Sequence, residues 1–137
     1  MKAIGIDHGD KRMGIAASDD LGMLAHPLEY ILAEPYEAFL TRLKTIMAER
    51  QIEQIVVGMP RNMDGSYGPQ ALKVRDFVAA LKNSVVVPVQ TWDERLTSVA
   101  AEKQLREAGV NAKKAKAKID ASAAAGMLQS YLDSFSG

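Results

Sequence analysis

Two short apolar runs separated by a polar turn open the chain, and this pattern predicts a β-hairpin. The turn covers residues 9–12 (GDKR). In the first run, Ile4 and Ile6 share one face of the strand, so Asp7 belongs to the opposite face where the strand ends. A carboxylate on a rigid strand end can serve as a metal ligand. The Asp-x-Gly pattern is also a common turn in which the carboxylate accepts backbone hydrogen bonds, so both interpretations stay open here.

The length of 137 residues predicts a single domain covering residues 1–137, long enough to bury a sizeable core. A hydrophobic fraction of 47% and a charged fraction of 25% are ordinary for a globular protein. The chain has no cysteine, which excludes disulfides and thiolate metal sites. It shows no signal-peptide pattern and no apolar run near the ~20 residues of a membrane helix, so we expect a cytoplasmic protein.

The charges balance over the whole chain but not along it. The formal net charge is zero, which argues against a general polyanion binder. Acidic residues outnumber basic ones over residues 1–60, and the reverse holds over residues 95–137. A lysine-rich segment at 110–118 lies in the second region. The sequence therefore predicts a local basic surface in the C-terminal part of the chain.

Helical and strand periodicities alternate after the hairpin. A third strand is expected around residues 28–31, and a helix begins near Pro35 with an apolar side that extends to Met47. Residues 54–60 are continuously apolar, as expected of a central parallel strand buried on both faces. The loop over 61–69 follows the carboxyl end of that strand, where α/β sheets build their sites, so we expect the loop to line a site.

The rest of the chain continues this alternation. Residues 70–82 predict a helix, and residues 85–92 predict a strand that Pro88 confines to an edge of the sheet. Three segments complete the chain: a helix over 98–108, the basic segment 110–118 as a mobile loop or a frayed helix start, and a final helix over 119–135.

The element order β-β-β-α-β-α-β-α-α predicts an α/β protein. Three antiparallel strands, and two more strands reached by helical crossovers, form a mixed five-stranded sheet with helices on both faces. In this sheet the first, fourth and last strands can be neighbours whose carboxyl ends point the same way.

Acidic residues occupy the tips of these elements. Asp7 ends the first strand, Asp93 and Glu94 follow the last strand, and Asp120 lies in the first turn of the final helix. Carboxylates that converge in water repel one another, and a divalent cation removes that cost. Mg²⁺ prefers carboxylate and water oxygens, and two such ions can support hydrolysis of a phosphodiester bond. The lysines beside Asp120 would supply the contacts to phosphate that a nuclease needs.

Each carboxylate also has an ordinary structural interpretation. Asp120 can complement the helix dipole, and Asp93 or Glu94 can cap the next helix or pair with Arg95. Adjacent strand residues face opposite ways, so one of the pair Asp93 and Glu94 is expected to point toward Asp7. Glu94 is favoured because its longer side chain can reach inward from the end of the strand.

Four aromatic or imidazole side chains offer less specific signals. His8 and His26 have no supporting cluster of metal ligands, so turn and packing roles are favoured for both. Trp92 and Tyr67 could stack on bases. For Trp92, at the end of a strand, a partly buried packing role is favoured.

Four motifs, in the order in which they occur along the chain, resemble those of the YqgF/RuvX family. Members of this family are named as pre-16S rRNA nucleases or Holliday junction resolvases. The motifs cover nearly the whole chain: 6–16 (IDHGDKRMGIA), 57–60 (VGMP) with 62–65 (NMDG), 93–97 (DERLT), and 119–120 (ID) with 123–124 (AA). The resemblance implies an RNase H-like fold and a nuclease site that binds Mg²⁺ or Mn²⁺, with two ions. It implies that Asp7, Glu94 (or Asp93) and Asp120 are the catalytic and metal-binding carboxylates.

The resemblance also implies which residues face nucleic acid: Lys11, Arg12, Asn62, Arg95, Lys113, Lys114, Lys116 and Lys118. The expected activity is that of a metal-dependent endonuclease that hydrolyses phosphodiester bonds in structured nucleic acid and processes the 5′ end of pre-16S rRNA. Ribosomal precursor particles are expected partners. Two alternatives stay open: a Holliday junction resolvase, for which a homodimer is expected, and a non-catalytic binding factor in transcription or ribosome assembly. The sequence is compatible with a monomer or a homodimer.

Overall fold

The computed structural model describes residues 1–96 and 112–135, and for residue 96 and residues 112–120 it describes the backbone alone. The elements are β1 (Ala3–Asp7), β2 (Arg12–Ser18), β3 (Ala25–Leu32), α1 (Tyr36–Arg50), β4 (Gln54–Met59), α2 (Pro69–Ser84), β5 (Val89–Asp93), the short 3₁₀ helix η1 (Glu94–Leu96) and α4 (Ala112–Asp133). No helix in these described ranges is long and apolar enough to cross a membrane.

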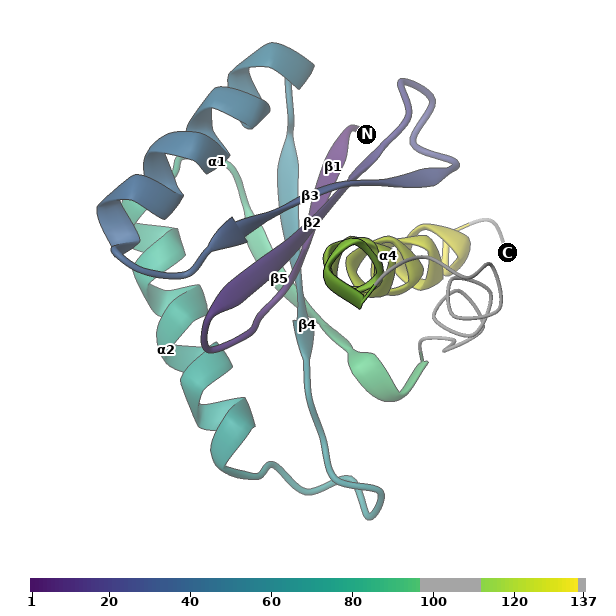
Figure 1. Cartoon of the computed structure of the whole chain (residues 1–137). Helices are drawn as coiled ribbons and strands as arrows, with labels where there is room; N and C mark the ends of the chain where they lie inside the picture. Colours follow the sequence, from purple (N-terminus) through teal and green to yellow (C-terminus); the bar gives the residue numbers. More distant parts are fainter. Residues whose placement is uncertain (97–111, 136–137) are drawn as a thin grey trace.

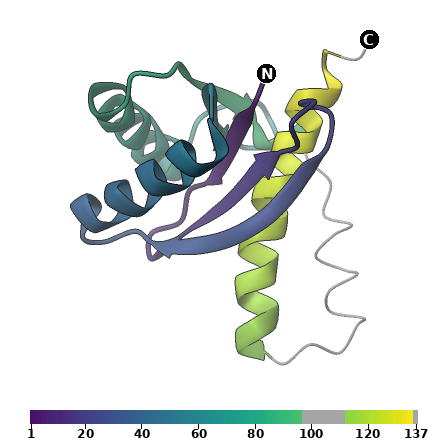
Figure 2. The ribbon, with the colours of Figure 1, turned by 90° about the horizontal axis from the view of Figure 1, so that it is seen from above.

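The five strands form one mixed sheet in the order β3-β2-β1-β4-β5. The pairs β1–β2 and β2–β3 are antiparallel, whereas β1–β4 and β4–β5 are parallel. Helices α1 and α2 cover one face of the sheet and α4 covers the other (Figures 1 and 2). The predicted α/β class, with helices on both faces of a mixed five-stranded sheet, is confirmed.

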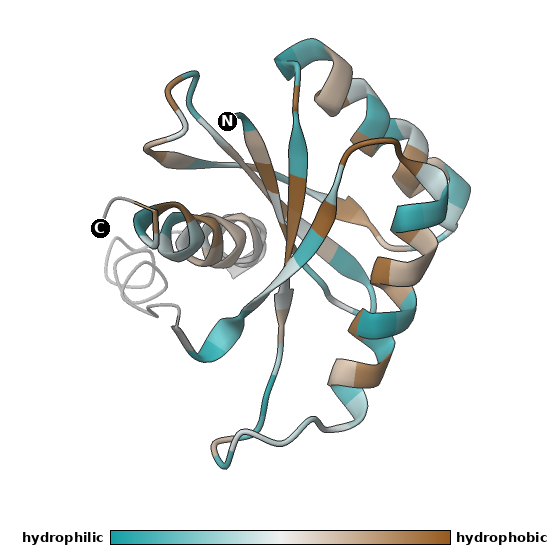
Figure 3. Cartoon of the chain, turned by 180° about the vertical axis from the view of Figure 1, so that it is seen from behind, coloured by the Kyte–Doolittle hydropathy of each residue, from teal (hydrophilic) through white to brown (hydrophobic). Residues whose placement is uncertain are grey.

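The sheet separates two apolar layers. Ile4 and Ile6 of β1 face α1 and α2, where they pack with Phe39 and Phe77. Ala3 belongs to the other layer, which α4 covers with residues such as Ala124, Met127 and Leu128. In Figure 3 the hydrophobic colour gathers on the central strands and on the helix sides that face them. The period-2 pattern of β1 therefore predicts correctly which of its residues point to each layer.

Several boundaries differ from the sequence prediction. The strand predicted over 85–92 begins at Val89, because Pro88 has no N–H to donate to a ladder. The helix predicted over 70–82 extends to Pro69–Ser84. Helix α4 begins at Ala112, so much of the basic segment 110–118 is helical, in keeping with the good helix propensity of alanine and lysine. The helix predicted over 98–108 lies outside the described residues.

Gly5 is the point where α4 approaches the backbone of β1. A Cβ at Gly5 would lie 2.9 Å from Leu128 Cβ and 3.3 Å from the carbonyl oxygen of Ala124. The first contact is closer than real Cβ atoms come, and neither neighbour is a flexible side-chain end. The absence of a side chain at Gly5 is therefore what lets the helix lie directly on the strand.

We expect Gly5→Ala to lower the free energy of unfolding by ~1–3 kcal/mol, because overpacking would push α4 away from β1. Urea unfolding followed by circular dichroism measures the effect. Gly68→Ala is the matched control, since its Cβ would make an ordinary 3.4 Å contact with Asn62. Equal stability of Gly5→Ala and the wild type would show that α4 does not press on β1 there.

Candidate active site

The carboxyl ends of three parallel strands meet at one edge of the sheet. β1, β4 and β5 are neighbours and run in the same direction, with Ile6 beside Val57 and Gly58 beside Trp92. Asp7 is the last residue of β1, Asp93 is the last residue of β5, and Glu94 begins η1. The topology thus places these strand-end carboxylates, which are far apart in sequence, at one edge of the sheet.

Glu94 turns back over the end of the central strand. A Cβ at Gly58 would lie 2.6 Å from Glu94 Oε1 and 2.9 Å from Glu94 Cγ, so the carboxylate occupies the space that a side chain at Gly58 would fill. Gly58 is flanked in β4 by Val57, which packs in the α1/α2 layer, and so its missing Cβ points to the α4 face. The Glu94 carboxylate therefore lies on the α4 face of the sheet.

Asp7 belongs to the same face. Ile6 packs in the α1/α2 layer, so the next residue points to the side that α4 covers. Because Ile6 pairs with Val57, Asp7 comes into line with Gly58 across the β1–β4 pair. The side chain of Asp7 is half-buried. Asp7 and Glu94 thus share one face at the row of the sheet where Gly58 leaves room.

Asp93 points to the opposite face of the sheet, and its carboxylate pairs with two arginines. Its Oδ2 atom lies 2.8 Å from Arg95 Nη2 and 3.4 Å from Arg61 Nη1, and its Oδ1 accepts a bond of 2.9 Å from the Arg95 backbone N–H. The hydrogen bonds from Arg95, together with the charges of both arginines, lower the pKa of Asp93 below its ordinary value. Asp93 is therefore an ion-paired carboxylate in this structure.

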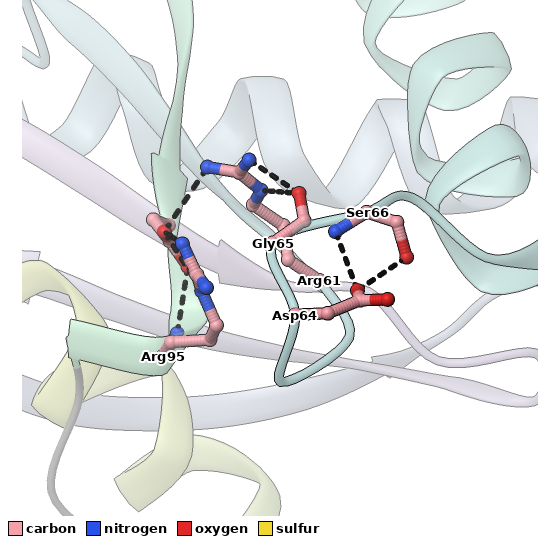
Figure 4. A network of polar contacts seen from close by, with 6 residues as sticks. Arg61, Asp64, Gly65, Ser66 and Arg95 are labelled. Carbon is pink, nitrogen blue, oxygen red and sulfur yellow. Dashed lines mark hydrogen bonds and ion pairs between the residues drawn. The ribbon is translucent and has the colours of Figure 1, made fainter.

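Figure 4 shows that the loop between β4 and α2 is ordered by its own polar contacts. The Asp64 carboxylate accepts bonds from the Ser66 N–H (2.9 Å) and the Ser66 hydroxyl (2.6 Å), which lower the pKa of Asp64. Both Arg61 Nε and Arg61 Nη2 donate to the carbonyl oxygen of Gly65. The Arg61 guanidinium also lies 4.7 Å from the centre of the Tyr67 ring. The loop that was expected to line a site is therefore fixed beside the end of β5.

Asp120 lies in α4, one helical turn before Ala124, whose backbone carbonyl oxygen faces Gly5 of β1. Its side chain and those of the four predicted lysines, Lys113, Lys114, Lys116 and Lys118, are outside the described side chains. Among the side chains that the structure does describe, no three His, Asp or Glu residues form a group that could hold a metal ion. The described part of the candidate metal site consists of Asp7 and Glu94.

The other predicted nucleic-acid contacts lie around this edge. Lys11 is exposed in the β1–β2 turn, and the Arg12 guanidinium lies 5.2 Å from the centre of the Tyr30 ring. Asn62 is exposed but donates a 3.0 Å hydrogen bond to the Ser66 hydroxyl, while Arg95 is held by Asp93. Lys11, Arg12, Asn62 and Arg95 thus come from three segments that flank the strand ends.

His8 and Trp92 have packing contacts. The His8 ring lies 5.1 Å from the Phe77 ring, and its buried Nδ1 has no hydrogen-bond partner among the described residues. Burial lowers the pKa of His8, which favours its neutral form. Trp92 Nε1 donates a 3.0 Å bond to Ser130, and its ring packs edge-on against Tyr131. Tyr67, by contrast, is 60% exposed at the loop.

Two residues that matter to this geometry are absent from the predicted site. Gly58 makes room for Glu94, and Arg61 holds Asp93. A glycine at the end of a continuously buried strand is a signal of close approach that could have identified Gly58. Nothing local to residue 61 indicates its pairing with Asp93, because 32 positions separate the two residues.

Sequence comparison places the chain among known proteins. Residues 1–134 match the family described as RuvX: Holliday junction resolvase. A protein of Halothermothrix orenii named "putative pre-16S rRNA nuclease" is 48% identical over 133 residues, which are 97% of this chain and 95% of that protein. A protein of the same name from Desulforamulus reducens is also 48% identical, over 98% of both chains.

Two resolvases of known structure have a similar fold. Thermus thermophilus RuvC in complex with a Holliday junction substrate has a TM-score of 0.55 at 20% identity, covering 100% of this chain and 97% of RuvC. The fowlpox virus Holliday junction resolvase has a TM-score of 0.57 at 14% identity, covering 98% and 99%. These likenesses confirm the RNase H-like fold. The match over residues 1–134, with relatives that are nearly half identical over almost their full length, shows that the chain belongs to the RuvX family.

Proposed function

We propose that this chain is a divalent-metal-dependent endonuclease that hydrolyses phosphodiester bonds in structured nucleic acid. The observation that carries the proposal is the placement of Glu94 over Gly58, on the same face and row of the sheet as Asp7. Two carboxylates so placed repel each other in water. A divalent cation bound at this edge would offset that repulsion.

The residues of this edge suit Mg²⁺ or Mn²⁺. Carboxylate oxygens are the ligands that these hard ions prefer, and the edge offers no thiolate because the chain has no cysteine. We assign Asp7 and Glu94 as ligands, with Asp120 as the third carboxylate and two ions in all. When bound, such ions supply an activated water and stabilise the charge that develops on the leaving oxygen.

The chain itself positions these groups and holds the substrate. The strand end of β1 fixes the direction of Asp7, and the missing side chain at Gly58 fixes the place of Glu94. We propose that Lys11 and Arg12 contact the phosphate backbone, together with Asn62, Arg95 and the four lysines of α4 (Lys113, Lys114, Lys116 and Lys118). Cation contacts to phosphate give affinity without base specificity, so binding is expected to weaken as salt rises.

The 5′ end of a 16S rRNA precursor is the favoured substrate, because relatives at 48% identity are named for that activity. The family description and the fold likeness to resolvases favour branched DNA as the second candidate. A ribosomal precursor particle is the expected partner in the first case and a homodimer in the second. We also propose that the protein acts in the cytoplasm, which suits a chain without cysteine.

Cleavage of two labelled substrates tests this proposal. A 16S rRNA precursor fragment and a four-way DNA junction are each incubated with Mg²⁺, Mn²⁺ or EDTA. We expect cleavage of the RNA with either metal and none with EDTA, because the proposed mechanism needs the metal to activate the water. Cleavage restricted to the junction would establish the resolvase instead. Binding without cleavage under every metal condition, with ribosomal precursor particles included, would indicate a binding factor.

A further inference from the structure

We propose that Asp93 is a positioning residue and not a metal ligand: its carboxylate holds Arg61 and Arg95, and so fixes the β4–α2 loop against the end of β5 beside Glu94. The term "Asp93 clamp" denotes these three residues, Arg61, Asp93 and Arg95. The inference rests on the proposed nuclease function. It assigns Asp93 a role of its own, whereas the sequence only favours Glu94 as the residue that points toward Asp7.

The first step is that both oxygens of Asp93 are already engaged. Oδ1 accepts from the backbone N–H of Arg95 at 2.9 Å and from Arg95 Nε at 3.2 Å. Oδ2 accepts from Arg95 Nε at 3.1 Å and Nη2 at 2.8 Å, and from Arg61 Nη1 at 3.4 Å. The Asp93 side chain is 18% exposed, so these pairs are partly shielded from water.

The second step is the electrostatic cost of a metal ion at Asp93. Two guanidinium groups within 3.4 Å of the same carboxylate repel any divalent cation that approaches it. A cation would also have to displace charge-assisted hydrogen bonds, which are among the stronger ones in proteins. Glu94, over the glycine of β4, has its carboxylate on the opposite face of the sheet from this cluster.

The third step is that Arg61 links Asp93 of β5 to the β4–α2 loop. Its guanidinium bonds the carbonyl oxygen of Gly65 through Nε (3.0 Å) and Nη2, and it lies over the Tyr67 ring at 4.7 Å. Gly65 has a φ of 88°, a conformation that glycine adopts without strain. Figure 4 shows the chain of contacts from β5 through Arg61 to the tip of the loop.

The clamp therefore joins the two segments that follow β4 and β5. Because Glu94 is the residue after Asp93, fixing Asp93 also fixes where the chain turns from β5 into η1. Residues that orient metal ligands without touching the metal typically contribute about 10–100-fold to activity. The same range is expected for the Asp93 clamp.

A double-mutant cycle with Arg61→Ala, Asp93→Ala and the double variant tests this role. Cleavage rates are measured against Mg²⁺ concentration for the wild type and the three variants. Each single variant is expected to lose about 10–100-fold in kcat, with Mg²⁺ half-saturation changed alike in both. The double variant is expected to lose no more than the worse single one, because both changes break the same contact. Arg75→Ala, an exposed arginine of α2, is the matched control and is expected to cleave at the wild-type rate.

If Asp93 were a metal ligand, the Mg²⁺ concentration for half-maximal cleavage would change in opposite directions in the two single variants. Arg61→Ala would free the carboxylate and lower the Mg²⁺ concentration needed, whereas Asp93→Ala would raise it. That opposite response, or additive losses in the double variant, would overturn the proposal. Arg61→Lys and Asp93→Asn repeat the test with milder changes if the alanine variants fail to fold.

Hydrogen exchange of the loop amides gives a readout that does not need activity. The backbone N–H groups of Gly65 and Ser66 bond within the loop, to the Asn62 carbonyl and the Asp64 carboxylate, and are expected to exchange faster, and equally so, in Arg61→Ala and Asp93→Ala. If the wild type cleaves nothing, the proposed function fails while this arm still tests the clamp. Unchanged exchange in both variants would show that the clamp does not hold the loop.

Discussion

Asp7→Asn is expected to abolish metal-dependent cleavage while leaving the fold intact. Asparagine keeps the size of the side chain and one oxygen, but removes the charge that would hold a cation at the end of β1. Loss of ~4 kcal/mol of transition-state stabilisation corresponds to a decrease of about a thousandfold in rate. Single-turnover cleavage of the substrate that the wild type cuts measures the effect, and thermal unfolding measures the stability.

The matched control for this variant is Asp10→Asn. Asp10 is an exposed aspartate in the turn that follows, and its carboxylate pairs with Lys73 at 3.1 Å. Surface pairs of this kind contribute little to stability, about 0–1 kcal/mol, so the control variant should fold and cleave like the wild type. Cleavage by Asp7→Asn at the wild-type rate would remove Asp7 from the site.

Gly58→Ala is expected to lower cleavage by about a hundredfold with little change in stability. The new Cβ would lie 2.6 Å from Glu94 Oε1, so the carboxylate must move off the end of β4. Moving a flexible side chain is inexpensive for folding, but a displacement of about 1 Å at a reacting group can reduce the rate about a hundredfold. Cleavage kinetics and urea unfolding of the same preparation separate the two effects.

A second variant shows whether Gly58 acts through Glu94. Glu94→Gln alone is expected to lose activity, and adding Gly58→Ala to it should cause no further loss, since the displaced carboxylate is already gone. A further decrease in the double variant would mean that the methyl group harms the site by another route, such as a shift of β1 against β4.

The order and direction of the strands could be predicted from the sequence because each depends on local patterns. The alternation in β1, the continuous apolar run of β4 and Pro88 before β5 each indicate a strand type, and short connections determine which strands are neighbours. The predicted start of α4 was wrong. Its first residues lack an apolar stripe, although alanine and lysine favour a helix there. Propensity outweighed periodicity at that end.

The candidate site was predictable only where it follows from strand ends. Asp7, Asp93 and Glu94 lie at one edge of the sheet because parallel strands end there, and the sequence indicates this. Which of Asp93 and Glu94 points to Asp7 depends on Arg61 and Gly58, whose partners lie more than 30 positions away. A pairing of that kind produces no periodic pattern in the sequence. A glycine indicates only that some other group approaches closely.

The contact of α4 with Gly5 has a consequence for how this family can vary. At residue 5, two residues before Asp7, the helix meets the main chain of β1 with no strand side chain between them. The spacing between the helix and the strand at this point therefore depends on the absence of a side chain at residue 5. Relatives that differ from this chain at about half of their positions can keep one set of dimensions at this edge, provided that residue 5 stays the smallest one.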